Sequence, residues 1–158
     1  MTSPTSFRVF ADDQSQRFPG IWRVLFQVAY GLTYAAQVAH WHISSPRFND
    51  LHEFFNDEYD LWFKNVDTIA EHIRQHPEDN LLPFSLPALA EGLKTFEATT
   101  DADALTKNYL QYLLAFESLV AKGDKAFEHP ADIDLLGELS RVVEKSKWKT
   151  ESILKVKQ

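Results

Sequence analysis

The feature that most constrains this chain is a helical repeat of apolar residues, present in four long stretches with prolines between them. In each stretch the apolar residues return every three or four positions, which places them on one face of an α-helix. Prolines separate such helices because the residue before a proline avoids the α region. The stretches cover about residues 20–43, 51–75, 105–129 and 133–153, and the breaks contain Pro46, Pro77 and Pro130.

Four long helices indicate an all-α protein, and their connections favour an antiparallel four-helix bundle. Ser85 and Pro87 predict a short extra helix, through about Lys94, in the crossover between helices two and three. A chain of 158 residues that is 44% hydrophobic can bury one core. Residues 1–19 are polar and lack the repeat, so we expect a flexible N-terminal arm (1–19) and one bundle domain (20–158).

Two local details follow from the same pattern. Asn49 or Asp50 is expected to cap the start of the second helix, because both side chains accept hydrogen bonds from the first turn. The inward-facing residues of the fourth helix are expected to be Leu136, Leu139, Val143 and Trp148.

Composition excludes several classes of protein. The chain has no cysteine, which excludes disulfides and thiolate metal sites and fits a reducing compartment. No stretch approaches about 18 uninterrupted apolar residues, so no membrane span is expected. The start of the chain lacks the pattern of a signal peptide, so a cytoplasmic protein is expected. The net charge of −7 argues against a surface devoted wholly to nucleic acid.

Four side chains in the first two predicted helices could bind a metal ion. His40 is in phase with the apolar face of the first helix, and His52 follows just across the turn, so neighbouring antiparallel helices could bring the rings together. Asp67 and Glu71 are four residues apart, so both carboxylates project from one face of the second helix. Imidazole and carboxylate together suit iron.

These residues also have plainer interpretations. A lone histidine on an apolar face is commonly a core residue, and carboxylates four residues apart are common on solvated helices. His42 lies two positions beyond His40 and, at about 100° per residue, faces largely the other way. We interpret His42 as a surface or interface residue.

Helix geometry decides how the four candidate ligands could share a site. His52 and Asp67 are fifteen residues apart, which is roughly 22 Å along a helix at about 1.5 Å per residue. Metal–ligand bonds are only about 2.0–2.6 Å long. A shared site would therefore take the histidines from one subunit and the carboxylates from another, and a two-fold axis would generate two equal sites. The metal hypothesis thus implies at least a homodimer.

The second helix and the turn before it resemble the signature of the Dps proteins, the DNA-binding proteins from starved cells, also called miniferritins. That signature pairs a His-Trp with a Leu-His and then with an Asp-x-x-x-Glu in a D-x-I-A-E run. The matching residues, with every spacing kept, are His40, Trp41, Leu51, His52, Asp67 and Glu71. The C-terminal DIDLLGELSRVVEKSKWKTES is also similar to the family's last helix, and the resemblance covers about residues 18–153.

The resemblance implies a hollow ferroxidase cage that prefers hydrogen peroxide, a dodecamer of ferritin-like bundles built from two-fold dimers. Such a cage binds Fe(II), oxidises it with hydrogen peroxide or O2, and stores the ferric mineral inside, which protects against oxidative stress. His40 and His52 would ligate the non-haem iron from one subunit, and Asp67 and Glu71 from its two-fold mate. Trp41 would be an aromatic electron donor beside the site, and its alternative interpretation is a core tryptophan.

Two residues depart from the family's pattern. Asn56 stands four positions after the second histidine, where the family usually has an acid, so the second and weaker iron position lacks its usual ligand unless Asp57 or Glu58 replaces it. His72 stands where the family commonly has an arginine that pairs with a site carboxylate. We therefore expect the site carboxylates to be held less firmly than in the family, and His72 is a candidate extra ligand.

Acids near the start of the fourth helix line three-fold pores in this family. The candidates here are Asp132, Asp134 and Glu138. Their alternative role is to complement the positive end of the helix dipole.

DNA binding in this family usually depends on a lysine-rich tail, and the first lysine of this chain is Lys64. The C-terminal end is more basic, but lysines at a helix end are commonly solvated and favourable to the dipole. Its lysines are Lys145, Lys147, Lys149, Lys155 and Lys157. DNA binding is therefore possible but not favoured. The main alternative to iron storage is a Dps-fold nucleoid protein with a secondary or degraded metal site, and a third is an interaction module whose histidines are core residues.

Overall fold

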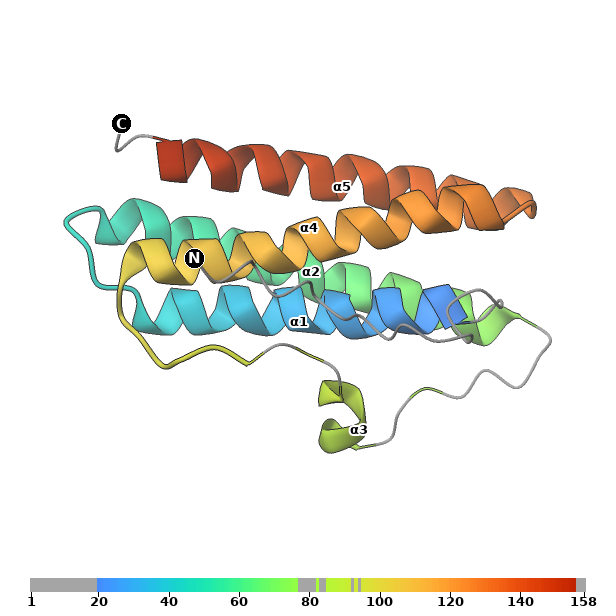
Figure 1. Ribbon diagram of the computed structural model, residues 1–158, viewed down its shortest axis with the longest axis horizontal. Coiled ribbons are helices and arrows are strands. Elements are labelled where there is room, and N and C mark those ends of the chain that lie inside the picture. The colour runs from blue at the N-terminus through green and yellow to red at the C-terminus, as the bar shows by residue number, and fades with distance from the viewer. Residues whose placement is uncertain (1–19, 77–81, 83–84, 92, 94, 156–158) are drawn as a thin grey trace, which may run out of the picture.

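The computed structural model describes residues 20–155 apart from 77–81, 83–84, 92 and 94, and it is all-α. Its helices are α1 (Gly20–His42), α2 (Phe48–Gln75), α3 (Leu86–Ala90), α4 (Ala102–Ala126) and α5 (Pro130–Lys155). The four long helices run side by side, and α3 lies in the crossover between α2 and α4 (Figure 1). The predicted four-helix bundle with its short extra helix is confirmed. The predicted N-terminal arm, residues 1–19, lies outside the described residues.

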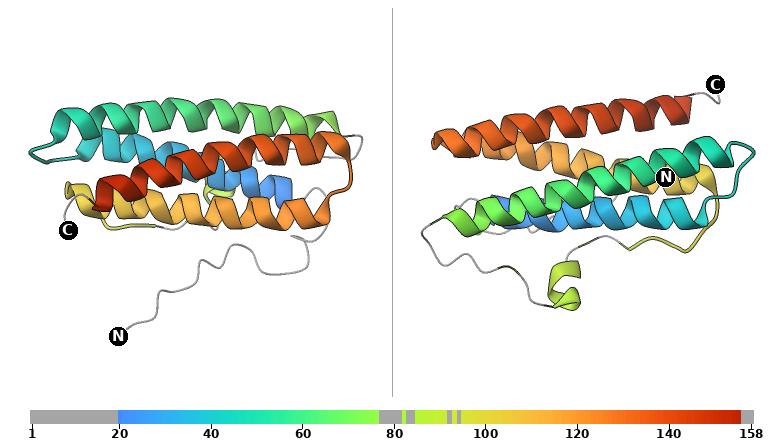
Figure 2. Two further views of the ribbon diagram at one scale, coloured as in Figure 1. Left: turned by 90° about the horizontal axis from the view of Figure 1, so that it is seen from above. Right: turned by 180° about the vertical axis from the view of Figure 1, so that it is seen from behind.

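Two antiparallel helix pairs share one core. Short turns join α1 to α2 and α4 to α5. Helix α4 also packs along α1, as both views in Figure 2 show. Burial of aromatic and aliphatic side chains between the pairs supplies the main stabilising energy. The largest fully buried aromatic side chains are Trp22, Trp62, Tyr109, Phe55 and Phe116. No helix in the described part of the chain has the continuous apolar length that crossing a membrane requires.

The turn between α1 and α2 is anchored to the start of α4. The Ser44 N–H donates to the carbonyl of Thr100 at 2.9 Å. The next residue, Asp101, caps α4, because its carboxylate accepts a backbone N–H of the first turn at 2.8 Å. These bonds hold the end of the bundle at which His40 and His52 lie.

The start of α2 differs from the prediction. The helix begins at Phe48, about one turn early, and neither Asn49 nor Asp50 caps it. Arg47 occupies the cap position without a side-chain hydrogen bond. The reason is the tight turn before it, in which the Phe48 N–H already bonds the Ser45 carbonyl at 3.0 Å, so that the turn continues directly into the helix.

The prediction that Trp148 faces inward is wrong, because its side chain is 65% exposed. It lies five positions after Val143, which carries it off the apolar face at about 100° per residue. The positions that continue the buried face carry Ser146 and Thr150 instead. The other predicted inward residues, Leu136, Leu139 and Val143, are buried.

Three helix ends also differ from the expected ones. Helix α4 ends at Ala126 rather than near His129, because Phe127 is extended, with φ −101° and ψ 141°. Helix α5 begins at Pro130, since proline suits the first helical turn. Helix α3 stops at Ala90, with the expected Ser85 as its cap.

Candidate functional site

His40 and His52 come together where α1 ends and α2 begins. Their rings stack nearly parallel, with centroids 3.8 Å apart and planes 17° from each other. Nδ1 of His40 lies 2.9 Å from the carbonyl oxygen of His52, and Nδ1 of His52 lies 2.8 Å from the carbonyl oxygen of His40. Both residues are half-buried. The structure thus places these two predicted residues in direct contact.

The reciprocal bonds determine which ring nitrogen each histidine leaves available. A carbonyl oxygen only accepts, so each Nδ1 carries the proton and donates. In the neutral ring Nε2 then has the lone pair that a metal ion needs, and the bond at Nδ1 orients the ring. The carbonyl of His40 belongs to the last turn of α1, where carbonyls have no partner within the helix, so His52 also caps α1.

Three further residues with aromatic rings lie close to His40 and His52 in the sequence, namely Phe48, Trp41 and His42. Phe48 stacks on His52 with centroids 4.8 Å apart and planes 23° from each other, which extends the stack to three rings. Trp41 is 60% exposed, so the alternative that it is a core tryptophan of this chain is wrong. His42 is exposed as well, in agreement with its interpretation as a surface or interface residue.

Asp67 and Glu71 do not approach His40 and His52 within one chain. Both carboxylates are exposed, and their spacing places them on one face of α2. They belong to the last third of that helix, whereas His52 belongs to its second turn. One chain therefore presents the histidines at one end of α2 and the carboxylates near the other.

Glu58 is not available to replace the acid that is missing at Asn56. Its side chain is 1% exposed and points into the bundle, where the Tyr109 hydroxyl donates to it at 2.7 Å and the Lys149 ammonium lies 3.6 Å away. Burial first, and the Glu58 charge second, raise the pKa of Tyr109 well above its ordinary value of 10.0. The idea that Glu58 shifts into the iron site is therefore wrong, and the exposed Asp57 is the remaining neighbouring acid.

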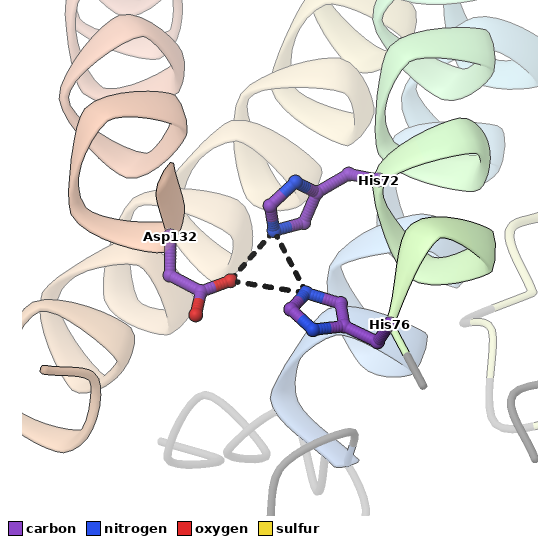
Figure 3. Close-up of side chains that lie close together, drawn as sticks. All are labelled: His72, His76 and Asp132. Atoms are coloured by element: carbon purple, nitrogen blue, oxygen red, sulfur yellow. Dashed lines mark hydrogen bonds and ion pairs between the residues drawn. The ribbon is translucent and has the colours of Figure 1, made fainter. Parts of the chain in front are cut away.

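A second cluster lies at the opposite end of α2 and consists of His72, His76 and Asp132 (Figure 3). Nε2 of His72 lies 2.6 Å from Oδ1 of Asp132, and Nε2 of His76 lies 3.4 Å from the same oxygen. The two Nε2 atoms are 3.3 Å apart. Both rings point from the end of α2 toward the carboxylate at the start of α5. This convergence makes the cluster a candidate metal site.

Asp132 is held from several sides within its own chain. Its side chain is only 3% exposed, and the indole N–H of Trp22 donates to its Oδ1 at 3.0 Å. The same indole packs on the His72 ring, with centroids 4.5 Å apart. Because Asp132 is buried in the bundle, the suggestion that it lines a pore is wrong. Asp134 and Glu138 are exposed.

Two members of the second cluster, His76 and Asp132, were not predicted as ligands. His72 and His76 are four residues apart, a spacing that puts two imidazoles on one helix face and suits a shared ion. That signal was present in the sequence. Asp132 is sixty residues beyond His72, and no local pattern connects them.

Three of the four lysines of α5 pair with acids of the same chain. The pairs are Lys147–Glu117, Lys149–Glu58 and Lys155–Glu151. The hydrogen bond to Glu117 raises the pKa of Lys147. Lys157 lies outside the described residues. These pairs reduce the positive charge that the described part of α5 offers to a phosphate backbone.

Comparison with known proteins identifies relatives along most of the chain. Residues 25–157 match the ferritin-like domain family. An uncharacterized low temperature-induced protein of Nostoc sp. (strain PCC 7120) is 24% identical over 148 residues, which cover 90% of this chain and 83% of that protein. Its homolog from Anabaena variabilis matches with the same values.

Solved structures of Dps proteins share the fold. Dps from Mycobacterium smegmatis, in a tetragonal form, has a TM-score of 0.76 at 17% identity and covers 94% of both chains. Dps from Thermosynechococcus elongatus has a TM-score of 0.75 at 15% identity, over 86% of this chain and 90% of that one. Dps from Microbacterium arborescens in the high iron form has a TM-score of 0.73 at 19% identity, over 92% and 98%.

Proposed function

Because this chain belongs to the ferritin-like domain family and shares the fold of the Dps proteins, we propose that it is a cytoplasmic miniferritin. In this proposal it binds Fe(II) at sites between subunits and oxidises it with hydrogen peroxide or O2. The ferric product is stored as a mineral inside a dodecameric cage, which protects the cell from oxidative stress. The protein is then a ferroxidase whose substrate is Fe(II).

The observation that carries this proposal is the reciprocal bonding of His40 and His52. Each Nδ1 is committed to the other residue's carbonyl, so both rings and their Nε2 lone pairs are oriented before any ion arrives. Two imidazoles alone do not complete a coordination sphere, and they leave positions for carboxylates, water and an oxidant. The pair therefore has the properties of one half of an iron site.

The other half is proposed to come from Asp67 and Glu71 of the two-fold mate. These carboxylates are exposed on one helix face and so are accessible to a second chain. Two copies of α2 packed antiparallel about a two-fold axis would bring the histidines of each chain to the carboxylates of the other. The same arrangement would repeat around the cage.

The residues around the site suggest how oxidation proceeds. Two Fe(II) ions each lose one electron, and one hydrogen peroxide takes up both electrons and two protons to give two waters. Where only one Fe(II) is bound, Trp41, exposed next to His40, is proposed to supply the second electron to the hydrogen peroxide. Asn56 is a poorer ligand than a carboxylate, so the two iron positions of each site should differ in affinity. The relative from Microbacterium arborescens was solved in a high iron form, which supports iron as the substrate.

Anaerobic Fe(II) titration followed by a pulse of hydrogen peroxide tests the proposal. We expect rapid oxidation that saturates at one or two irons per chain and is lost in His52→Ala. His42→Ala is the matched control, because His42 is exposed at the same helix end and is not a proposed ligand. Oxidation no faster than in buffer, or equal loss in the control, would contradict the proposal.

Mixed oligomers test whether the site is shared between chains. One variant carries His40→Ala and His52→Ala, and the other carries Asp67→Ala and Glu71→Ala. The two are mixed in equal amounts in denaturant, and the mixture is then refolded. Random pairing about the two-fold axis should restore about a quarter of the sites, because half of the dimers are mixed and each has one intact site of two. A site within one chain would give no recovery.

DNA binding is the alternative function, and the ion pairs of the α5 lysines weigh against it. A gel shift measured at increasing salt separates the two functions, because binding to phosphates falls steeply with ionic strength. We expect no shift at physiological salt.

A further inference from the structure

We propose that His72, His76 and Asp132 form a second metal site, built within one chain and specific for divalent transition metal ions. The three ligand atoms are Nε2 of each histidine and Oδ1 of the aspartate, and they come from the end of α2 and the start of α5 (Figure 3). This site is separate from the proposed ferroxidase site and does not require a second subunit.

The distances between the ligand atoms fit a four-coordinate ion. Bonds of about 2.0–2.1 Å in a tetrahedral arrangement separate neighbouring ligand atoms by about 3.3–3.4 Å. The distances from His76 Nε2 to His72 Nε2 and to Asp132 Oδ1 are 3.3 Å and 3.4 Å. The third edge, from His72 Nε2 to the carboxylate, is 2.6 Å, the length of a hydrogen bond. An ion would replace the proton of that bond and widen this edge by a side-chain rotation.

The carboxylate is oriented before any ion binds. Asp132 is almost fully buried, and the Trp22 indole N–H bonds its Oδ1 while the indole ring packs against His72. Ligands that neighbouring groups hold in this way are typical of metal sites rather than of mobile surface acids. The side chains of His72 and His76 are 11% and 15% exposed, so the ring atoms are shielded but remain within reach of solvent.

The donor set indicates the class of ion. Two imidazoles and one carboxylate suit Fe(II), Zn(II) and Co(II) and are poor ligands for Ca(II) or Mg(II), which prefer oxygen. Three protein ligands leave a position for water, and the exposed His129 lies nearby, with Nδ1 4.0 Å from Oδ2 of Asp132. An ion here would tie the end of α2 to the start of α5, so its binding should stabilise the bundle.

Co(II) and Zn(II) titrations of the full chain, freed of metal with a chelator, test the second site. The background is His52→Ala, which removes the proposed intersubunit site, and the test variant adds His76→Gln. We expect His52→Ala to bind one Co(II) per chain with the visible absorption of a four-coordinate complex, and the double variant to lose it. Excess Zn(II), at about a hundred times its Kd, should raise the Tm of His52→Ala by roughly 5–10 °C and leave the double variant unchanged.

Two controls make the outcome decisive. His42→Gln in the same background should keep the Co(II) spectrum, because His42 is exposed at the other end of the bundle. Anomalous scattering from Co(II)-treated crystals of His52→Ala should place the ion between His72, His76 and Asp132, whether or not the double variant folds. No binding by His52→Ala, an unchanged spectrum in a folded double variant, or an ion elsewhere would each overturn the proposal. Loss of iron oxidation in His52→Ala tests only the ferroxidase site.

Discussion

The two ends of α2 use histidine in opposite ways. At the first end, His40 and His52 commit Nδ1 to backbone carbonyls and leave Nε2 for an ion. At the other end, His72 and His76 direct Nε2 toward a carboxylate of the same chain, and the indole of Trp22 supports that carboxylate. In our proposals the first pair takes its carboxylates from a second chain, whereas the second cluster has its three ligand atoms in one chain.

This difference shows that the neighbouring helix at each end of α2 decides which further ligand the same chain can supply. The end of α2 that carries His72 lies against the start of α5, which supplies Asp132. At the end that carries His52, the end of α1 supplies a second imidazole, whose ring stacks on that of His52. The carboxylates for that pair are what the proposed two-fold mate would supply.

The largest expected effect comes from comparing His52→Ala with His76→Gln. The rate of peroxide-driven Fe(II) oxidation should fall by roughly 100-fold or more in His52→Ala, because a proposed ligand and the cap of α1 are both lost. In His76→Gln the initial rate should not change, since its cluster lies at the other end of α2. Stopped-flow absorbance of the ferric product measures both rates. Equal losses in the two variants would mean that the two ends form one functional unit.

The next effect is on stability. Asp132→Ala leaves the Trp22 indole N–H without its acceptor in the interior, which should cost about 1–3 kcal/mol. For a chain of this size that corresponds to a Tm lower by roughly 2–4 °C per kcal/mol. Thermal unfolding followed by circular dichroism measures the shift. The control is Asp134→Ala, an exposed acid two positions later, which should leave the Tm unchanged.

A pH dependence is expected from Tyr109 of α4, which bonds to Glu58 of α2 between the two proposed metal sites. Burial and Glu58 raise the pKa of Tyr109 above its ordinary 10.0, so the fold favours the protonated hydroxyl. The stabilisation is complete below pH 10 and is lost as the pH rises above it, by at most about 1.4 kcal/mol per pH unit.

Urea unfolding between pH 8 and about pH 11 measures this loss. Tyr109→Phe should be less stable at neutral pH, because the hydroxyl also accepts from Trp62 at 2.7 Å, but its stability should fall less above pH 10. Tyr34→Phe is the control, since Tyr34 is exposed. The same alkaline decline in Tyr109→Phe as in the original chain would contradict this account.

The smallest expected effect concerns the Phe48 ring, which stacks on His52 at the start of α2. Phe48→Ala removes the aromatic contact with His52, a contact of about 0.5–1.5 kcal/mol. Fe(II) affinity should therefore fall by roughly twofold to tenfold, while the maximal oxidation rate is retained. Trp148→Ala, which removes an exposed ring on α5, should not change the affinity in the same titration.

The sequence by itself determined the helices and the pairing of His40 with His52. Helical periodicity is a local property, and prolines mark its breaks, so the four long helices could be predicted without tertiary information. The two histidines are separated by one short turn, and antiparallel neighbours across such a turn have little freedom to place them apart. The error at Trp148 shows the limit of the approach, because the apolar residue lies out of phase with the buried face that Ser146 and Thr150 continue.

Only the tertiary structure decided which polar groups the bundle encloses. Glu58 lies inside and Asp67 outside on the same helix, because Tyr109 and Lys149 happen to face the first and nothing in the described chain covers the second. Asp132 became a partner of His72 because the α4–α5 pair packs with its turn at the end of α2. Contacts between residues sixty positions apart depend on how whole helices pack, and no local pattern of residue types encodes that arrangement.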